Sequence, residues 1–180
     1  ERIAERRANS QQSELLDEDD AGRSPAPLPP GAKLLRDVRY GADRRQSMDV
    51  YLPQDARNAP VILMVHGGGW RTGDKAMRSV TANKVARWVG RGYVFVSANY
   101  RMLPEADPLA QADDVARALA DAQAQAASWG GDPAKFVLMG HSAGAHLVAL
   151  LSADPSKALA LGAKPWLGTV ALDSAAFDVA

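Results

Sequence analysis

The sequence contains no cysteine, and its 21 basic and 21 acidic residues give a formal net charge of 0. Without cysteine there is no disulfide framework, no cysteine-ligated zinc cluster and no thiol nucleophile, and the redox compartment stays open. The balanced charge gives no reason to expect nucleic acid or an anionic membrane as a partner. No apolar run approaches the ~20 residues of a membrane-spanning helix. With 47% hydrophobic residues, the chain has the composition of an ordinary globular domain.

Residues 1–32 differ in composition from the rest of the chain. This segment is highly charged at first and rich in proline over 24–30, which predicts a polar arm and a semi-rigid spacer before a single domain at 33–180. Its few apolar residues leave open a short helix. Because the chain starts at Glu1 rather than Met, we expect that an N-terminal piece has been removed. An export signal is one candidate for that piece, so both the cytoplasm and export stay open.

After residue 33 the hydrophobic pattern alternates between strand and helix types. Alternating or continuous apolar runs predict strands, and apolar residues three or four apart predict helices. We expect a hairpin of half-exposed strands at 34–40 and 47–52, further strands at 61–65, 93–97, 136–139 and 167–172, and helices at 80–89, 113–127 and from the turn after 139 to about 152. This order predicts an α/β fold with a mostly parallel sheet, helices on both faces and a site at the carboxyl ends of the strands.

The segment 136–147 carries the clearest chemical pattern. An apolar strand enters the turn Gly140-His141-Ser142-Ala143-Gly144 and leaves as an Ala/Leu-rich helix. In a G-x-S-x-G turn of this kind, the serine is held on a sharp, strained corner with its hydroxyl exposed. Gly140 and Gly144 flank Ser142 because a Cβ at either position would collide in so tight a turn. The pattern predicts that Ser142 is a nucleophile.

A second motif follows the predicted strand at 61–65. There the chain reads His66-Gly67-Gly68-Gly69-Trp70, a glycine-rich loop of the type that supplies backbone N–H groups to an oxyanion in lipases and esterases. Glycine allows such a loop to approach a substrate closely. Two motifs in this order, each after an apolar run, strengthen the assignment of Ser142.

These motifs resemble the α/β-hydrolase superfamily, and within it the carboxylesterases related to hormone-sensitive lipase and the bacterial feruloyl-esterase-like proteins. Residues 73–75 (Gly-Asp-Lys), 99–105 (Asn-Tyr-Arg-Met-Leu-Pro-Glu) and 129–133 (Trp-Gly-Gly-Asp-Pro) extend the resemblance, which runs from about Leu34 to the end of the chain. The resemblance implies the α/β-hydrolase fold and a serine esterase that takes a small-molecule ester without metal or cofactor.

The resemblance also implies particular roles around the nucleophile. The N–H groups of Gly68, Gly69 and Ala143 are expected to hold the oxyanion, and His66 to shape the loop rather than act as base. Trp70 is either a lining residue of the acyl or alcohol pocket or a core aromatic under the loop. Asp74 with Lys75 is expected to brace the loop.

None of the three histidines fits the general base. In this superfamily the triad follows the order Ser, acid, His, and His66 precedes Ser142. His141 occupies the variable position of the turn. His146 lies four positions along the following helix, where its side chain points away from the exposed hydroxyl, so we expect a packed or hydrogen-bonded helix histidine.

No carboxylate fits the triad acid either. Asp173, after the last predicted strand, is expected to cap a turn with Ser174 rather than take part in catalysis, and Asp178 is the other candidate. The remaining aspartates of interest, Asp107, Asp113 and Asp114, read as helix-start carboxylates.

The chain therefore resembles the N-terminal part of an esterase, incomplete at the C-terminal edge of its sheet, without triad acid and base. Its last strand would be an exposed edge, open to self-association, and the chain alone is expected to be nearly inactive. Two alternatives stay open. One is an amidase or peptidase of the arylformamidase or prolyl-oligopeptidase kind, although the loop motif favours the esterase. The other is a binding protein that kept the scaffold without catalysis.

Overall fold

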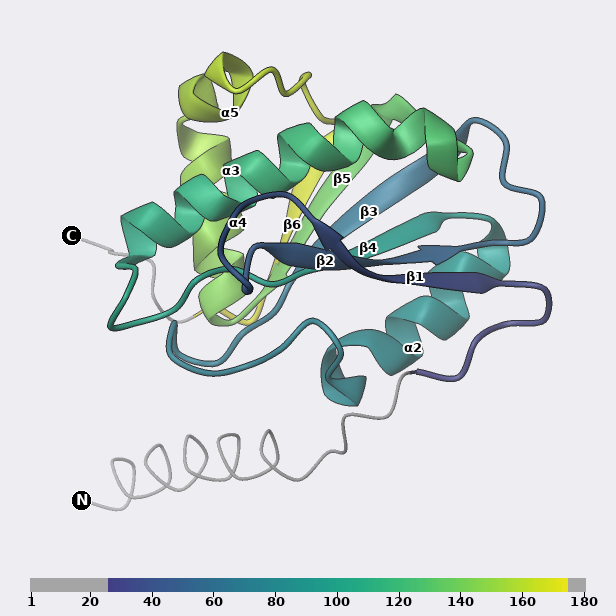
Figure 1. Ribbon diagram of the computed structural model, residues 1–180, viewed down its shortest axis with the longest axis horizontal. Coiled ribbons are helices and arrows are strands. Elements are labelled where there is room, and N and C mark those ends of the chain that lie inside the picture. The colour runs from purple at the N-terminus through teal and green to yellow at the C-terminus, as the bar shows by residue number, and fades with distance from the viewer. Residues whose placement is uncertain (1–25, 175–180) are drawn as a thin grey trace.

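A six-stranded sheet forms the centre of the computed structural model, which describes residues 26–174 (Figure 1). The strands are β1 (Lys33–Arg39), β2 (Ser47–Leu52), β3 (Ala59–Val65), β4 (Val94–Ala98), β5 (Gly131–His141) and β6 (Gly168–Leu172). The helices are α2 (Arg78–Trp88), α3 (Pro108–Gln125), α4 (Ala143–Ala153) and α5 (Ser156–Ala160), with the 3₁₀ segments η1 (Val89–Arg91) and η2 (Ala126–Trp129).

The strand order is β1-β2-β4-β3-β5-β6. Strands β3, β4, β5 and β6 run parallel, whereas β1 and β2 form an antiparallel hairpin that pairs with β4. The predicted mostly parallel α/β sheet is confirmed. Its parallel part is joined through helices, as parallel strands require.

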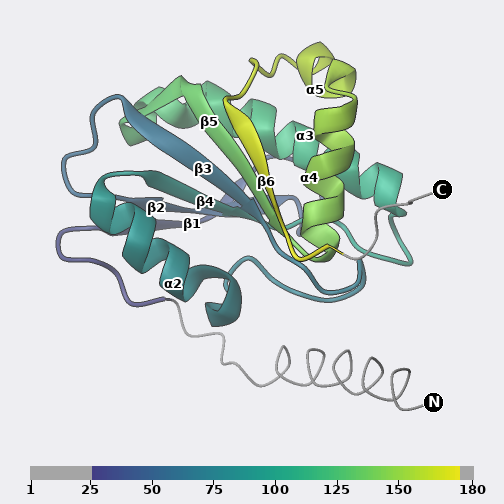
Figure 2. The same cartoon turned by 180° about the vertical axis from the view of Figure 1, so that it is seen from behind.

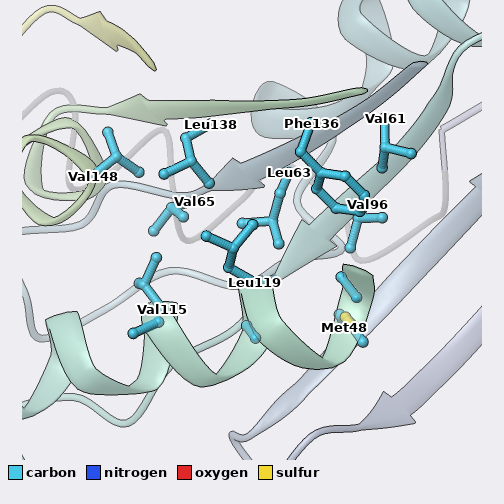
Figure 3. Close-up of a cluster of buried hydrophobic side chains, with 14 of the residues drawn as sticks. Met48, Val61, Leu63, Val65, Val96, Val115, Leu119, Phe136, Leu138 and Val148 are labelled. Atoms are coloured by element: carbon cyan, nitrogen blue, oxygen red, sulfur yellow. The ribbon is translucent and has the colours of Figure 1, made fainter. Parts of the chain in front are cut away.

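Helices cover both faces of the sheet, with α2 on one face and α3 and α4 on the other (Figures 1 and 2). The alternation of side chains along β3 explains the two layers. Val61, Leu63 and Val65 join the larger core cluster with α3 and α4, and Ile62 and Met64 join the smaller cluster under α2. Figure 3 shows the larger cluster, in which Val115 and Leu119 of α3 face the sheet residues.

Several predicted boundaries were wrong. The second hairpin strand, β2, is buried rather than half-exposed, because it lies between β1 and β4 inside the sheet. The predicted helix 113–127 begins earlier, at Pro108, because Asp107 caps it and proline suits the first helical turn. The short helix α5 was not predicted.

The segment just before β1 also contacts the folded body. Ala26 is buried in the cluster under α2, and Ala32 packs against the same cluster. The rest of the predicted arm, residues 1–25, lies outside the described residues, as does its proposed short helix. No helix within residues 26–174 is long and apolar enough to cross a membrane.

The parallel strands bring the two motifs together at one edge of the sheet. β3 and β5 are neighbours, and Val65 is paired with Gly140, so the loop after β3 and the turn after β5 begin side by side. The strand β6 is the last in the strand order, because it pairs with β5 and with no other described strand. Leu167, just before β6, is 68% exposed. Self-association through this edge stays a prediction.

Candidate active site

Ser142 lies on a strained turn between β5 and α4. It has φ 52° and ψ −118°, a backbone conformation that a non-glycine residue seldom adopts. Its side chain is half-buried, and its backbone N–H donates to the carbonyl of Leu172 in β6 at 2.9 Å. Ala143 is the first residue of α4, so its N–H belongs to the first turn, where backbone donors lack helical partners. The predicted strand-to-helix turn is confirmed.

The glycines of this turn are required by backbone contacts. A Cβ on Gly140 would lie 2.3 Å from the carbonyl oxygen of Gly144. A Cβ on Gly144 would lie 2.2 Å from the carbonyl oxygen of Val65 and 2.5 Å from that of His66. Because the obstacles are backbone atoms, no rotamer change relieves them. The first turn of α4 is thus packed directly against the end of β3.

The glycine-rich loop contacts the serine turn. A Cβ on Gly67 would lie 3.0 Å from the Cβ of Ser142, so the two motifs touch at these residues. Gly68, Gly69 and Trp70 then follow in sequence with φ of 117°, 57° and 62°. For a bulky residue such as Trp70 this region is an outlier that surrounding contacts must hold in place. Gly69 is exposed, whereas Gly67 and Gly68 are buried.

Hydrogen bonds to the carbonyls fix the direction of the loop's N–H groups. In a planar trans peptide the C=O and the following N–H point in opposite directions. The carbonyl of Gly67 accepts from His66 Nδ1 at 2.7 Å, which turns the Gly68 N–H away from His66. The carbonyl of Gly68 accepts from the N–H groups of Arg71 and Thr72 and from the Thr72 hydroxyl, at 3.0–3.1 Å. The Gly69 N–H is therefore directed away from that turn.

His66 is completely buried below the loop. Its ring stacks on Tyr100 with 4.6 Å between ring centroids, and the Tyr100 hydroxyl donates to the His66 carbonyl at 3.0 Å. Burial lowers the pKa of His66, so the ring is neutral and carries its proton on Nδ1, since Gly67 offers only a carbonyl acceptor there. The loop-shaping role of His66 stays a prediction.

The side chain of Trp70 joins the loop to α4, the helix after Ser142. Its indole packs edge-on against the ring of His146 at 5.5 Å and against the larger core cluster. Burial lowers the pKa of His146, and its Nδ1 has no hydrogen-bond partner among the described residues. His146 is thus a packed helix residue, as expected. His141 lies at the end of β5, next to Gly67.

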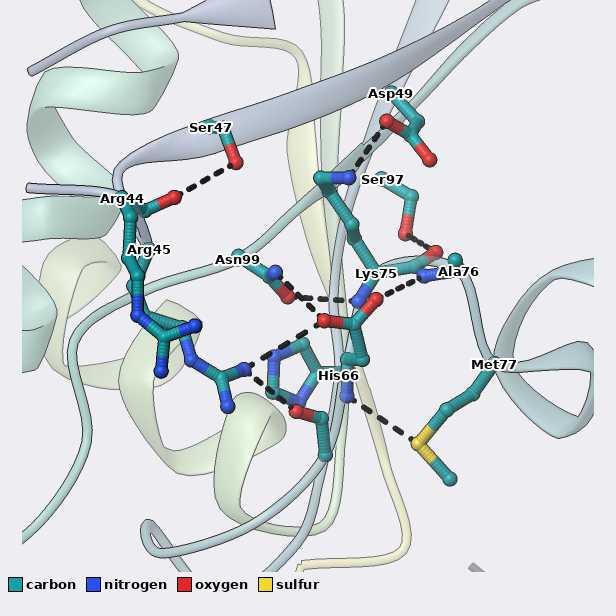
Figure 4. Close-up of polar contacts among 12 residues, drawn as sticks. Arg44, Arg45, Ser47, Asp49, His66, Lys75, Ala76, Met77, Ser97 and Asn99 are labelled. Atoms are coloured by element: carbon teal, nitrogen blue, oxygen red, sulfur yellow. Dashed lines mark hydrogen bonds and ion pairs between the residues drawn. The ribbon is translucent and has the colours of Figure 1, made fainter. Parts of the chain in front are cut away.

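Asp74 and Lys75 hold the far end of the loop through polar contacts, and Figure 4 shows Lys75 beside Asn99. The Asn99 side chain holds both residues, donating to the Asp74 carboxylate at 3.0 Å and accepting from the Lys75 N–H at 2.7 Å. Burial acts to raise the pKa of Asp74, but the hydrogen bonds from Asn99 and the Ala76 N–H outweigh it and lower that pKa. Arg45 lies 3.6 Å from the same carboxylate.

The ammonium group of Lys75 reaches away from Asp74 into the hairpin. Its Nζ lies 2.7 Å from Asp49 of β2 and 2.8 Å from Asp37 of β1. Burial alone would lower the pKa of Lys75, but hydrogen bonds to these two carboxylates raise it. The loop after β3 is therefore tied to the hairpin through an ion cluster in which Lys75 and Asp49 are buried and Asp37 is exposed.

The expectation for the three aspartates of α3 was partly wrong. Asp107 is the N-cap, and its carboxylate accepts from the Ala110 N–H at 2.9 Å. Asp113 and Asp114 lie inside the helix because α3 begins at Pro108. Asp114 is buried and accepts from Arg101 Nη2 at 2.7 Å; Asp113 pairs with a lysine of α5.

Two polar residues that hold the loop were missed by the sequence analysis, namely Gln111 and Asn99. Gln111 is fully buried on α3 and donates from Nε2 to the carbonyl of Trp70 at 3.0 Å. A signal was present, because Gln111 falls three and four positions before Asp114 and Val115 on the buried face of the helix. A polar side chain within an apolar helical stripe indicates a buried hydrogen-bond partner.

The structure describes one of the two candidates for the triad acid. Asp173 follows β6 at the same edge as Ser142, is exposed and has φ 53°. Asp178 lies outside the described residues. Within residues 26–174, no cluster of three or more histidine or acidic side chains is arranged to hold a metal ion.

With this geometry in place, comparisons with known proteins define the class. Esterase B from Lactobacillus rhamnosis superposes with a TM-score of 0.66 at 26% identity, over 96% of this chain and 54% of that structure. The esterase Est2 of Thermogutta terrifontis superposes with a TM-score of 0.55 at 30% identity, over 67% of this chain and 44% of that structure. The fold is that of α/β-hydrolase esterases.

The family follows from sequence. A family model described as BD-FAE matches residues 48–162, more than half of the chain, and the chain belongs to this family of α/β-hydrolase esterase type. Among curated relatives, esterase LipQ of Mycobacterium tuberculosis is 37% identical over 139 residues, and a probable isoprenylcysteine alpha-carbonyl methylesterase of Oryza sativa subsp. japonica is 33% identical over 118 residues. These matches cover 73% and 65% of this chain, which spans about a third of each relative's length, 32% and 28%.

Proposed function

We propose that this chain carries the nucleophile and oxyanion hole of a serine carboxylesterase that cleaves small carboxylic esters through an acyl-enzyme. The observation that carries the proposal is the contact between the strained Ser142 turn and the left-handed glycine loop. Neither feature is needed for a stable sheet, and strained backbone of this kind persists where a site requires it. The relatives support an ester substrate because each is named an esterase or a methylesterase.

In the proposed reaction, Ser142 Oγ attacks the ester carbonyl carbon and its proton passes to a general base. The carbonyl oxygen becomes an oxyanion, which accepts from the N–H groups of Gly68, Gly69 and Ala143. Each such donor contributes about 10²–10³ in rate in well-studied enzymes. The tetrahedral intermediate expels the alcohol, which takes up a proton, and water then hydrolyses the acyl-enzyme by the same steps.

The described residues do not supply the base in this proposal. His66 directs its proton to the Gly67 carbonyl beneath the loop and is neutral and fully buried. His146 is packed edge-on against Trp70, one helical turn beyond the nucleophile. A serine without its base retains only the contribution of binding and the oxyanion hole, about 10³–10⁴ over water. We therefore expect the chain to react slowly but at Ser142.

The test is labelling of the chain by a fluorophosphonate, followed by intact mass and peptide mapping. We expect slow formation of one adduct on Ser142, accelerated by added imidazole, which can stand in for the absent base. Ser142→Ala should form no adduct under either condition. Ser152→Ala is the matched control and should label like the parent chain. It removes the hydroxyl of an exposed serine in α4 that hydrogen-bonds to Val148 and Thr169.

Two results would overturn parts of the proposal. Equal labelling of the Ser142→Ala variant would refute the nucleophile. Rapid, stoichiometric labelling without imidazole would refute the claim that the chain lacks a general base. The histidines at 66, 141 and 146 would then be the candidates for that base.

A further inference from the structure

The side chain of Gln111 enters the back of the glycine loop from α3. Its Nε2 donates to the carbonyl of Trp70 at 3.0 Å and to the carbonyl of Ala106 at 2.8 Å. Both neighbours are carbonyl acceptors, so the amide nitrogen must face them. Its Oε1 is then left buried without a hydrogen-bond partner among the described residues.

That unpaired oxygen distinguishes Gln111 from a residue that serves stability alone. Gln123, on the same helix and also buried, uses both ends of its amide. It donates to the Lys164 carbonyl at 3.0 Å and accepts from the Lys164 N–H at 2.7 Å. A buried acceptor without a partner destabilises the folded state, so the donors of Gln111 serve an arrangement for which that cost is tolerated.

The hydrogen bonds connect Gln111 to an oxyanion donor in two steps. The carbonyl of Trp70 accepts from Gln111 Nε2 and from the Leu103 N–H, the latter at 2.9 Å. These two hydrogen bonds fix the plane of the Trp70–Arg71 peptide. The N–H of that peptide, on Arg71, donates to the Gly68 carbonyl at 3.1 Å. The Gly68 carbonyl in turn shares a peptide plane with the Gly69 N–H and sets its direction.

We propose that Gln111 is a positioning residue of the oxyanion hole. By holding the carbonyl of Trp70 it keeps the left-handed run from Gly68 to Trp70 in the form that presents the Gly69 N–H to the substrate oxygen. This inference rests on the proposed function for its catalytic meaning, while the loop geometry that it predicts can be measured without catalysis.

The experiment compares Gln111→Met with Gln123→Met in the full chain. Methionine keeps the length and volume of glutamine while removing its donors. Backbone NMR of the labelled chain should show displaced amide signals at Gly68 and Gly69, and a displaced carbonyl carbon signal at Trp70, in Gln111→Met. Gln123→Met should leave these three signals in place while losing thermal stability to a similar degree.

Imidazole-assisted labelling of Ser142 provides the second readout. Misplacing a reacting or stabilising group by about 1 Å can cost 10²-fold in rate, so we expect Gln111→Met to label about 10- to 100-fold more slowly than the parent and Gln123→Met to label at the parent rate. If the parent chain itself fails to label, the proposed function fails, while the NMR comparison still decides the role of Gln111.

The inference is overturned if Gln111→Met shifts the Gly68 and Gly69 signals no more than Gln123→Met does. Should Gln111→Met not fold, the parent chain still provides a test. Its Gln111 side-chain amide protons should exchange with solvent far more slowly than those of the exposed Gln54. Equally fast exchange would contradict the hydrogen bonds by which Gln111 holds the loop.

Discussion

Replacing Gly144 with alanine tests whether the serine turn and the glycine loop are packed together through their backbones. The new Cβ would lie 2.2 Å from the Val65 carbonyl oxygen and 2.5 Å from that of His66. Overpacking a close-packed region costs about 1–3 kcal/mol, and a contact with rigid backbone belongs at the upper end. With about 2–4 °C per kcal/mol for a domain of this size, we expect Gly144→Ala to lower the melting temperature by about 6–12 °C.

The assay is thermal unfolding followed by circular dichroism, with Gly90→Ala as the matched control. Gly90 lies in η1, and a Cβ there meets nothing within 4 Å. Since alanine is favoured over glycine in helical backbone by up to about 1 kcal/mol, Gly90→Ala should leave the melting temperature unchanged or raise it. A Gly144→Ala variant as stable as the parent would refute the tight backbone packing on which the proposed oxyanion hole depends.

Two further predictions concern the charges below the loop, one on Lys75 and one on His66. Lys75→Met should lower the free energy of unfolding in urea by about 3–5 kcal/mol, because it leaves the buried Asp49 carboxylate without its cation. Lys157→Met, the control, removes a more exposed ion pair with Asp113 and should lower it by less than about 1 kcal/mol. Equal losses in the two variants would contradict a buried Lys75–Asp49 pair. Burial lowers the pKa of His66 below its unfolded value of 6.5, so the unfolded chain binds more protons and stability should fall as pH drops below 6.5, by up to about 1.4 kcal/mol per pH unit. His66→Asn, which keeps a donor for the loop but does not titrate, should weaken that slope, and an unchanged slope argues against a buried neutral His66.

The parts of the site that are local in sequence were predictable. Gly140, Ser142 and Gly144 fall within one turn, and the demands of that turn on backbone space can be read from residue type and spacing. The strand before His66 and the strand before Ser142 were both recognisable from their apolar runs. Because parallel strands end at one edge of a sheet, their meeting followed from the fold class.

The parts that depend on distant partners were not predictable. Lys75 was expected to brace the loop, but its partner Asp49 lies in a strand whose position beside β4 the sequence does not reveal. Asp114 reads as a helix-start carboxylate until the helix is seen to begin at Pro108, and its pairing with Arg101 depends on where the loop before α3 folds back. Such contacts are set by tertiary packing rather than by local propensity.

The hydrogen bond from the Ser142 N–H to the Leu172 carbonyl connects β6, the last strand of the described sheet, to the proposed nucleophile. Edge strands open locally at lower free energy than strands in the centre of a sheet. Hydrogen exchange at the Ser142 amide should therefore report fraying of β6 rather than global unfolding. A partner that covers the outer side of β6 would slow that exchange and hold the proposed nucleophile more rigidly, without contacting the bound ester.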